Sequence, residues 1–291
     1  MSHAPPQVTN TCAIRFHGLR RSGNHAVIEW ICDQVDGKIV HLNDIRDRSM
    51  DPYLGCESLA VRGIAYGICK GGVRDRLIYY AKRLMVQSPE LVFYPPYDPL
   101  ITVERVRRVP NKSLLVMSYE DRDLSSVCCP QYESQRETYI GYSQREFDVL
   151  LLRDPYNLFA SMVHSRRLSE RNQATIVETW KQHAREYLGQ TQHLQYSHAL
   201  INYNRWVTDQ VYQHELLASL GIENRRPVHS KVPIYGNGSS FEGRTKDGRA
   251  NEMKVLERWK RLEGNPLYEA LFADEEVASL SNAIFGAIRV R

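Results

Sequence analysis

Residues 16–25 read FHGLRRSGNH, directly after the short apolar run CAIR. The apolar residues predict a buried strand over residues 12–18. The next segment, NHAVIEWICDQV at residues 24–35, has apolar side chains at helical spacing and predicts an amphipathic helix. A strand, a glycine-rich turn and a helix in this order form a phosphate-binding element in many α/β proteins. The stretch therefore predicts an anion site at the turn.

The turn has the glycine spacing of the nucleotide-binding P-loop, G-x-x-x-x-G, at Gly18 and Gly23. Asn24 and His25 stand where that loop carries lysine and then serine or threonine. The usual magnesium ligand is therefore missing, and Ser22 is not in the position to replace it. The turn predicts an anion held without magnesium.

Two arginines add positive charge to this turn. Arg20 and Arg21 lie beside the backbone amides of residues 21–25, which would point at an anion from the start of the helix. A guanidinium grips a phosphate through two hydrogen bonds. The alternative interpretation is a tight turn with two solvated arginines.

Strands and helices alternate along the rest of the chain. Apolar runs at 37–44, 113–119 and 147–154 predict strands, and helical patterns follow at 155–168 and 173–189. This alternation predicts an α/β fold, a single domain with a central parallel sheet flanked by helices. Further helices are expected at 73–85, near 205–220, at 251–263 and at 274–286. No linker-like stretch divides the chain, so we expect one domain over residues 12–291 and a disordered N-terminus over residues 1–11.

The composition narrows the class of protein. The 291 residues are 42% hydrophobic and 25% charged, and a net charge of +4 is too weak to indicate nucleic-acid binding by itself. No run is long and apolar enough to cross a membrane, and six cysteines without C-x-x-C spacing indicate reduced thiols. We expect a soluble, cytoplasmic protein without a nucleic-acid or membrane partner, and the oligomeric state stays open. The ten histidines show no paired metal-ligand spacing, so no metal site is expected.

A second motif, VLLLRDPYNLFASMVHSRR, begins at residue 149. Arg153 closes the predicted strand, Pro155 suits the first turn of a helix, and Ser161 follows eight residues after the arginine. Ligands of parallel α/β sheets bind beyond the carboxyl ends of the strands, so this pair would lie near the first loop. Arg153 and Ser161 could hold a second phosphate, or Arg153 could simply pair with Asp154 or a neighbour.

The two motifs together resemble those of the sulfotransferases that use 3′-phosphoadenosine 5′-phosphosulfate (PAPS). That family has an R/K-S-G loop after its first strand and an R-[DN]-P strand end with a serine eight residues on. The resemblance covers about half of the chain and implies the parallel α/β sheet, a P-loop-like phosphosulfate-binding loop and a transfer that needs no metal. It implies that RRSGNH binds the 5′-phosphosulfate, with Arg21 matching the family's usual lysine, and that Arg153 and Ser161 bind the 3′-phosphate.

The sequence departs from the family pattern in places. Ala26 stands where many members carry a tryptophan that contacts adenine, and the loop at 236–249 matches the family's late basic loop only in character. Phe241 there could stack on adenine or anchor the loop by packing. The residues expected to bind the donor are Arg20, Arg21, Ser22, Gly23, Asn24, His25, Arg153, Ser161, Phe241, Arg244, Lys246 and Arg249.

Sulfuryl transfer needs a base for the acceptor's proton and a stabiliser for the leaving nucleotide. Arg21 and His25 are expected to stabilise the leaving group, although His25 could instead cap the helix. Glu120, at the end of the strand LLVMSYE, is our first candidate for the base, as the family has its base near a strand end. His41, which lies in the predicted strand at 37–44, is second, and His164, one turn after Ser161, is third.

Acidic residues surround the expected acceptor side, and Tyr119, Asp44 and Asp121 are expected to orient the acceptor. The segments 42–54 and 118–123 carry Asp44, Asp47, Asp51, Glu120, Asp121 and Asp123. Carboxylates there would favour a small cation, such as a guanidinium alkaloid of the saxitoxin type or another amine-bearing metabolite. The alternative is that they pair with Arg46, Arg48 or Arg122. Two other functions remain open, a P-loop kinase with a degenerate loop and a non-catalytic nucleotide-binding protein.

Overall fold

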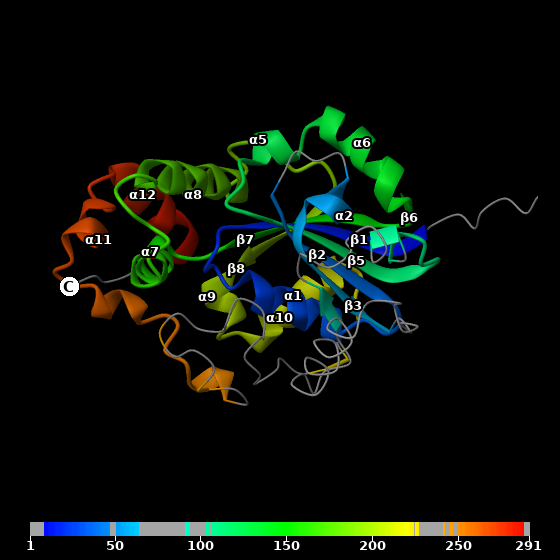
Figure 1. The fold of residues 1–291 in the computed structure, drawn as a ribbon. Coiled ribbons are helices and arrows are strands. Elements are labelled where there is room, and N and C mark those ends of the chain that lie inside the picture. Colours follow the sequence, from blue (N-terminus) through cyan, green and yellow to red (C-terminus); the bar gives the residue numbers. More distant parts are fainter. Residues whose placement is uncertain are drawn as a thin grey trace, which may run out of the picture. The chain divides into compact units, whose positions relative to one another are not determined.

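One sheet of eight strands organises the computed structural model (Figure 1). Its path runs β4-β3-β2-β5-β1-β7-β8, and β6 pairs with β1. The strands are β1 (Thr9–Gly18), β2 (Ile39–Ile45), β3 (Cys56–Arg62), β4 (Leu91–Phe93), β5 (Lys112–Glu120), β6 (Tyr142–Ser143), β7 (Glu146–Leu152) and β8 (Ser197–Asn202). The structure describes residues 9–46, 51–63, 91–93, 103–104, 106–223, 225–226, 241, 245–246 and 249–287.

Helices flank the sheet, as the sequence predicts for an α/β fold. They are α1 (Asn24–Asp33), α2 (Pro52–Gly55), α5 (Leu124–Val127), α6 (Pro130–Ile140), α7 (Pro155–His164), α8 (Gln173–Tyr187), α9 (Tyr203–Trp206), α10 (Gln210–Ser219), α11 (Pro266–Ala270) and α12 (Glu275–Phe285), with 3₁₀ turns η2 (Ala250–Glu252) and η3 (Arg258–Arg261). The predicted fold class, a mixed α/β domain with a central, mostly parallel sheet, is confirmed.

The chain forms two compact units whose segments alternate in the sequence. Unit 1 consists of Met1–Phe16, Val35–Tyr119 and Cys129–Phe147, and unit 2 of His17–Gln34, Glu120–Cys128 and Asp148–Arg291. Strands β1, β5 and β7 each continue from one unit into the other. Because these strands are continuous, the chain is a single domain.

In unit 1, β2 pairs parallel with β5 and antiparallel with β3, and β3 pairs antiparallel with β4. The parallel pair aligns Ile39 with Leu114 and Leu42 with Met117, and these four side chains are buried. Apolar runs of this kind suit strands that are covered on both faces. This register brings the carboxyl ends of β2 and β5 side by side, and these ends carry His41, Asp44 and Ser118.

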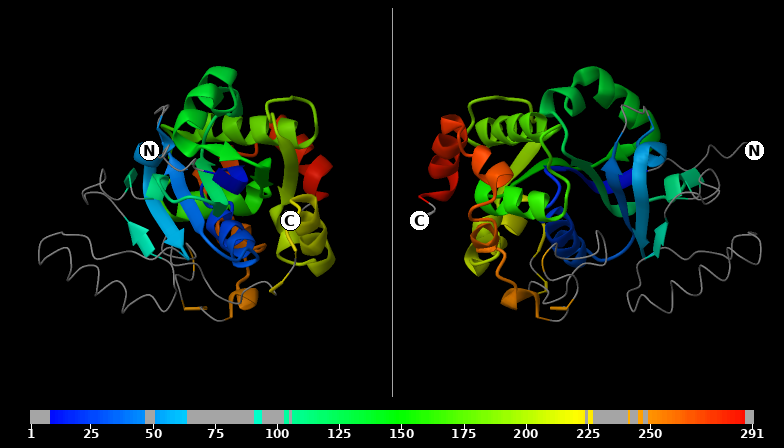
Figure 2. Two further views of the ribbon diagram at one scale, coloured as in Figure 1. Left: turned by 90° about the vertical axis from the view of Figure 1, so that its right-hand side faces the viewer. Right: turned by 60° about the vertical axis from the view of Figure 1, so that its left-hand side comes forward.

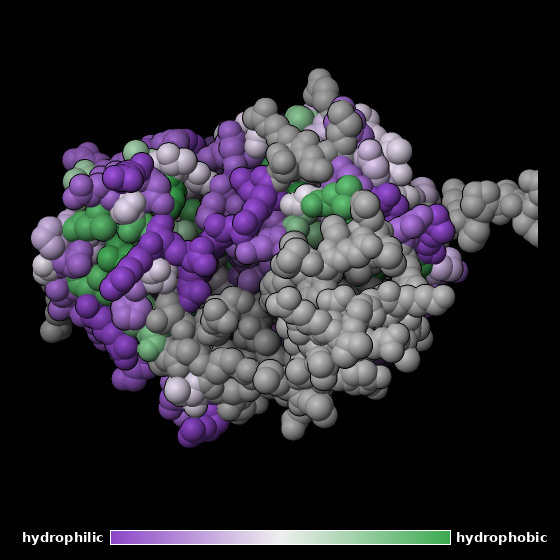
Figure 3. All heavy atoms as spheres, viewed as in Figure 1, coloured by the Kyte–Doolittle hydropathy of each residue, from purple (hydrophilic) through white to green (hydrophobic). Residues whose placement is uncertain are grey.

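In unit 2, helices pack around a core that includes Trp180, Phe159 and Leu158. α12 lies beside α8, and α7 packs against α11 and η3 (Figures 1 and 2). Hydrophobic side chains also reach the surface over α7 and α11 (Figure 3), where partly buried residues such as Leu267 and Phe272 pack against the core. The packing holds α7 and η3 together, and both carry arginine or serine side chains of the candidate site.

Several sequence predictions differ from the structure. β1 begins at Thr9, so residues 9–11, expected to be disordered, belong to a strand in which Asn10 is fully buried. The helix expected at 251–263 is wrong, because only the short turns η2 and η3 form there. Asn157 explains part of this, since its Oδ1 accepts hydrogen bonds from the backbone of Arg258 and Trp259. The helix expected at 73–85 lies outside the described residues.

Candidate active site

The loop between β1 and α1 has the conformation of an anion-binding turn. Gly23 precedes α1 with φ 102°, and Arg21 has φ 70°, so both lie in the left-handed region. A Cβ at Gly23 would lie 2.3 Å from the ring of Tyr203, so this position requires glycine twice over. The amides at the start of α1 are thereby directed along the helix axis, where an anion is favoured.

Ser22 gives a direct test of whether this loop fits an anion. Its side chain is fully buried, and its Oγ has no hydrogen-bond partner among the described residues. A buried hydroxyl without a partner costs free energy unless a bound group accepts its hydrogen bond. The loop therefore fits an oxyanion such as a phosphate or sulfate group.

Three arginine side chains of unit 2 meet at the neighbouring motif. Arg21 Nε lies 3.5 Å from Ser161 Oγ, and an amino group of Arg258 lies 3.4 Å from the same oxygen. Arg153 donates to the carbonyl oxygen of Arg21 at 2.9 Å. The two sequence motifs, 140 residues apart at Arg21 and Ser161, are thus in direct contact. We call Arg21, Arg153, Arg258 and Ser161 the arginine cluster.

The electrostatics of the arginine cluster favour an anion. Burial lowers the pKa of Arg21, and the positive charges of Arg167 and Arg153 lower it further, while Glu120 raises it. A pKa lowered by nearby positive charge means that a negative charge at this place would be stabilised. Arg258 and Arg167 were not among the predicted site residues. Arg167 ends the quoted motif VLLLRDPYNLFASMVHSRR, but only Arg153 and Ser161 were singled out in it.

The first turn of α7 is built as the sequence predicts. Pro155 opens the helix, and Asp154 caps it by accepting a hydrogen bond from the Asn157 amide at 2.8 Å. Arg153 does not form the alternative pair with Asp154 in any described hydrogen bond. Its donors go to backbone carbonyls of Arg21 and Val255, and its guanidinium lies 5.0 Å from the centre of the Tyr203 ring.

The late basic loop contributes less than expected in its described part. Phe241 stacks on His164 with ring centres 4.1 Å apart, and Arg258 and Arg261 also lie over its ring. Phe241 and His164 thus pack against each other, and the stacking of Phe241 on adenine stays a prediction. Lys246 pairs with Glu252 at 2.8 Å, and Arg249 lies 3.5 Å from the same carboxylate. Arg244 lies outside the described residues.

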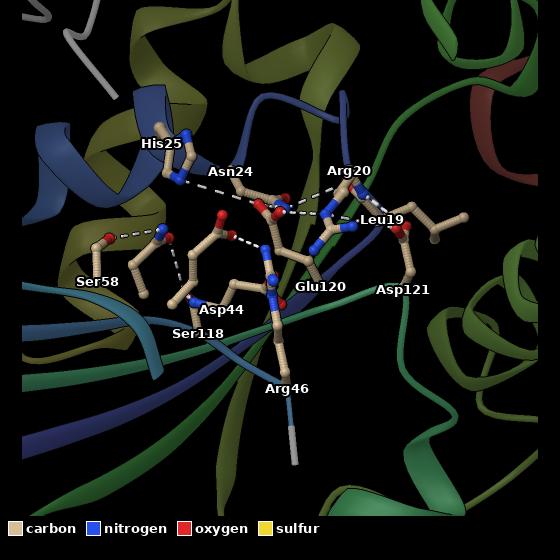
Figure 4. Close-up of polar contacts among 12 residues, drawn as sticks. Leu19, Arg20, Asn24, His25, Asp44, Arg46, Ser58, Ser118, Glu120 and Asp121 are labelled. Carbon is tan, nitrogen blue, oxygen red and sulfur yellow. Dashed lines mark hydrogen bonds and ion pairs between the residues drawn. The ribbon is translucent and has the colours of Figure 1, made fainter. Parts of the chain in front are cut away.

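Glu120, our first candidate for the base, is hydrogen-bonded to the loop at residues 19–23, between β1 and α1, and to the first residue of α1 (Figure 4). Its Oε1 accepts a hydrogen bond from Asn24 at 2.9 Å, and its Oε2 accepts one from Arg20 Nε at 3.1 Å. His25 Nε2 lies 3.9 Å from Glu120 Oε1. Asp121, expected at the acceptor, instead accepts a hydrogen bond from the Arg20 amide at 2.8 Å.

In unit 1, the side chain of His41, the second candidate for the base, belongs to a buried chain of hydrogen bonds. His41 Nε2 lies 3.2 Å from Ser118 Oγ, and both side chains are buried. The amide of Asp44 donates to the same oxygen at 3.0 Å. Asp44 is fully buried, and its Oδ2 accepts a hydrogen bond from Arg46 at 3.1 Å, as Figure 4 shows.

Tyr119 is also a core residue of unit 1. It is almost fully buried, and its ring meets that of Tyr132 edge to face, with centres 6.3 Å apart. Burial raises the pKa of its hydroxyl above the ordinary value. Neither Tyr119 nor Asp44 exposes the side-chain surface that direct acceptor binding would use.

Among the residues that the structure describes, no three histidine, cysteine, aspartate or glutamate side chains gather as a metal site would require. None of the helices described is long and apolar enough to cross a membrane.

Comparison with known proteins gives matches in structure alone. No family model and no curated protein matches the sequence. The sulfotransferase domain from the Synechococcus PCC 7002 olefin synthase aligns with a TM-score of 0.47 and 13% identity, covering 97% of this chain and 98% of that one. The sulfotransferase domain from the curacin biosynthetic pathway aligns with a TM-score of 0.43 and 15% identity over the same shares. Both of these solved structures are sulfotransferase domains.

Proposed function

We propose that this protein is a sulfotransferase that moves a sulfuryl group from PAPS to a hydroxyl or amine of a small acceptor. The observation that carries the proposal is the arginine cluster, in which the loop arginine Arg21 and the α7 residue Ser161 lie together. A donor with phosphate groups at both its 5′ and 3′ positions needs two anion sites close to each other. The loop amides with Ser22 and the arginine cluster supply such a pair within unit 2.

The residues of this chain would act by binding and by stabilising charge. When bound, PAPS supplies an activated sulfuryl group: the acceptor's oxygen or nitrogen forms a new bond to sulfur, and the bond from sulfur to the phosphate oxygen breaks. The leaving product is 3′-phosphoadenosine 5′-phosphate (PAP). Arg21 and the amides at the start of α1 would stabilise the charge that develops on PAP. Arg153 and Ser161 would hold the 3′-phosphate, and a base would accept the acceptor's proton.

The acceptor's charge is left to experiment. Most of the acidic residues expected to recognise a cation are used inside the protein: Asp44 binds Arg46, Asp51 pairs with Arg107, Asp121 binds the Arg20 amide and Asp123 caps α5. These contacts weaken the case for a guanidinium alkaloid of the saxitoxin type. A competition assay with a neutral phenol, an acidic glycan fragment and a guanidinium alcohol would identify the class that is turned over.

A thermal-shift assay separates the proposed function from its rivals. PAP should raise the melting temperature without magnesium, and ATP should do little, since the loop lacks the lysine and serine or threonine of a kinase P-loop. A kinase with a degenerate loop would give the opposite pattern and need magnesium. A non-catalytic binding protein would respond to PAP but transfer no labelled sulfate to any acceptor.

Arg153→Ala tests the 3′-phosphate assignment. We expect the affinity for PAP to fall roughly 10- to 150-fold, since a hydrogen bond to a charged group is worth about 1.5–3 kcal/mol. Affinity for adenosine 5′-phosphosulfate, which lacks the 3′-phosphate, should change far less. Arg225→Ala, which removes an exposed arginine paired with Glu223, is the matched control. Equal losses for both nucleotides would refute the assignment.

A further inference from the structure

Both carboxylate oxygens of Glu120 are hydrogen-bonded within the donor loop and the start of α1. Oε1 accepts from Asn24 Nδ2 at 2.9 Å and Oε2 from Arg20 Nε at 3.1 Å, while the residue as a whole is 9% exposed. Figure 4 shows the carboxylate between these two side chains. Each carboxylate oxygen thus already accepts a hydrogen bond from a side chain of this region, so the group is engaged in holding both neighbours.

Asn24 joins three parts of the same region. Its Nδ2 also donates to the carbonyl oxygen of Leu19 at 3.1 Å, and the side chain is 4% exposed. Its Oδ1 packs on Gly18, where an added Cβ would lie 2.5 Å from that oxygen. One amide group thus links the first residues of the loop, the first turn of α1 and the end of β5.

Asp121 adds two hydrogen bonds to the backbone of the same loop. Its Oδ1 accepts a hydrogen bond from the Arg20 amide at 2.8 Å, and its own amide donates to the Gly18 carbonyl oxygen at 3.2 Å. Asp121 and Arg21 have φ of 56° and 70°, in the left-handed region that non-glycine residues rarely adopt. Such backbone conformations persist where surrounding contacts fix them. The Asp121 contacts fix the beginning of the loop, at Gly18 and Arg20.

We propose that Glu120 is a positioning residue that, through Asn24 and Arg20, fixes the donor loop in its binding conformation. The proposal rests on the proposed function, because it takes the loop to be the donor site. It reassigns our first candidate for the general base. The proton of the acceptor then goes to another group. It also explains Asn24, whose amide supplies the two donors that this arrangement needs.

Glu120→Gln separates the two roles. The glutamine has one oxygen and one NH₂ group, so it leaves Asn24 or Arg20 facing a donor instead of an acceptor. A positioning role predicts that the Kd for PAP rises roughly tenfold or more, the loss expected for hydrogen bonds to a charged group. It also predicts that kcat, measured at saturating PAPS, falls at acidic pH in Glu120→Gln to the same extent as in the wild type. An unchanged Kd for PAP, with that acidic decline abolished, would overturn the proposal and make Glu120 the base.

A reciprocal exchange tests the contact itself. Asn24→Asp alone places two carboxylates together and should weaken PAP binding. Adding Glu120→Gln restores a donor opposite an acceptor, so the double variant should bind PAP more tightly than Asn24→Asp. Both variants lack the Leu19 contact, which therefore cancels in the comparison. Additive losses in the double variant would contradict a direct coupling between the two side chains.

Amide hydrogen exchange provides a measurement that needs no nucleotide. In the free protein, the amides of residues 20–24 should exchange faster in Glu120→Gln than in the wild type. Glu215→Gln makes the same chemical change on an exposed part of α10 and should leave those amides unchanged. Faster exchange in a protein that binds no PAP would support the positioning role and refute the proposed function. Wild-type exchange rates in a protein that binds PAP would refute the positioning role alone.

Discussion

The arginine cluster of unit 2 and two arginines of unit 1 differ in the kind of partner that they contact. In unit 2, Arg21 and Arg258 contact the hydroxyl of Ser161, and Arg153 contacts backbone carbonyls. In unit 1, the guanidinium groups of Arg46 and Arg107 contact carboxylates instead. Arginines that gather on neutral oxygens keep most of their capacity to bind an anion, whereas arginines on carboxylates serve the structure.

A buried example in unit 1 extends this contrast. Glu133 pairs with both Arg15 and Arg136, and all three side chains are nearly inaccessible to solvent. The shared carboxylate compensates the burial of the two guanidinium groups. The type of partner, more than the number of arginines, therefore separates a candidate binding site from a structural ion cluster.

Removing one arginine from the arginine cluster, and one from a carboxylate pair as control, gives the largest expected effect on activity. Arg21→Ala should lower kcat/KM for PAPS roughly 100- to 1,000-fold, the usual loss when a donor to developing charge is removed. Arg46→Ala, which removes an arginine bound to Asp44 and Glu57, should leave the Kd for PAP unchanged. Steady-state kinetics and PAP titration measure the two quantities. Similar losses in both variants would remove the distinction.

A buried histidine of unit 2, His183, also has a neutral oxygen as its partner, and it should make the stability of the folded protein depend on pH. Burial lowers the pKa of His183 from 6.5 to about 4, and its Nε2 lies 2.9 Å from the Arg122 carbonyl oxygen. Between these two values the unfolded chain binds more protons than the folded one. The folded state therefore loses stability as the pH falls from 6.5 to 4, by up to about 3 kcal/mol in total, and the contribution is complete above pH 6.5.

Urea unfolding at pH 7.5 and pH 4.5 measures this loss. His183→Gln, which keeps a hydrogen-bonding side chain that does not titrate, should show a smaller difference between the two pH values than the wild type. An equal difference in both proteins would mean that another group causes the acid sensitivity.

Arg258→Ala gives the smallest of these effects. It removes a contact of 3.4 Å with Ser161 and one of the guanidinium groups over Phe241, so PAP affinity should fall roughly 2- to 12-fold, as for a hydrogen bond worth about 0.5–1.5 kcal/mol. Lys260→Ala is the control, because Lys260 lies in the same 3₁₀ turn and its ammonium pairs with Glu257. Wild-type affinity for PAP in Arg258→Ala would show that Arg258 does not contribute to nucleotide binding.

The parts that the sequence predicts well depend on local patterns. Residues that are close together in the sequence predict strand β1, the turn with Gly23 and the start of α7 at Pro155. Arg153 and Ser161 were found because strand ends in parallel sheets gather at one edge. The contact between Arg21 and Ser161 agrees with that expectation.

The parts that the sequence misses depend on partners far along the chain. The segment near Arg258 has a helical pattern, but Asn157 binds its backbone and only a 3₁₀ turn forms. Asp44 is typical of a solvent-facing loop residue by sequence, yet it is buried and bound to Arg46. Tyr203 carries no motif, and only the folded chain reveals that it lies against Gly23.

The contact of Gly23 with Tyr203 has a consequence for synthesis of the protein. The donor loop lies near the N-terminus, but the ring that packs against it belongs to a residue 180 positions later. A ribosome adds roughly 5–20 residues per second, so about 10–40 seconds separate the emergence of these two segments. Nascent chains would therefore acquire the ability to bind nucleotide late, and truncated products that end before Tyr203 should not compete with the complete protein for the donor.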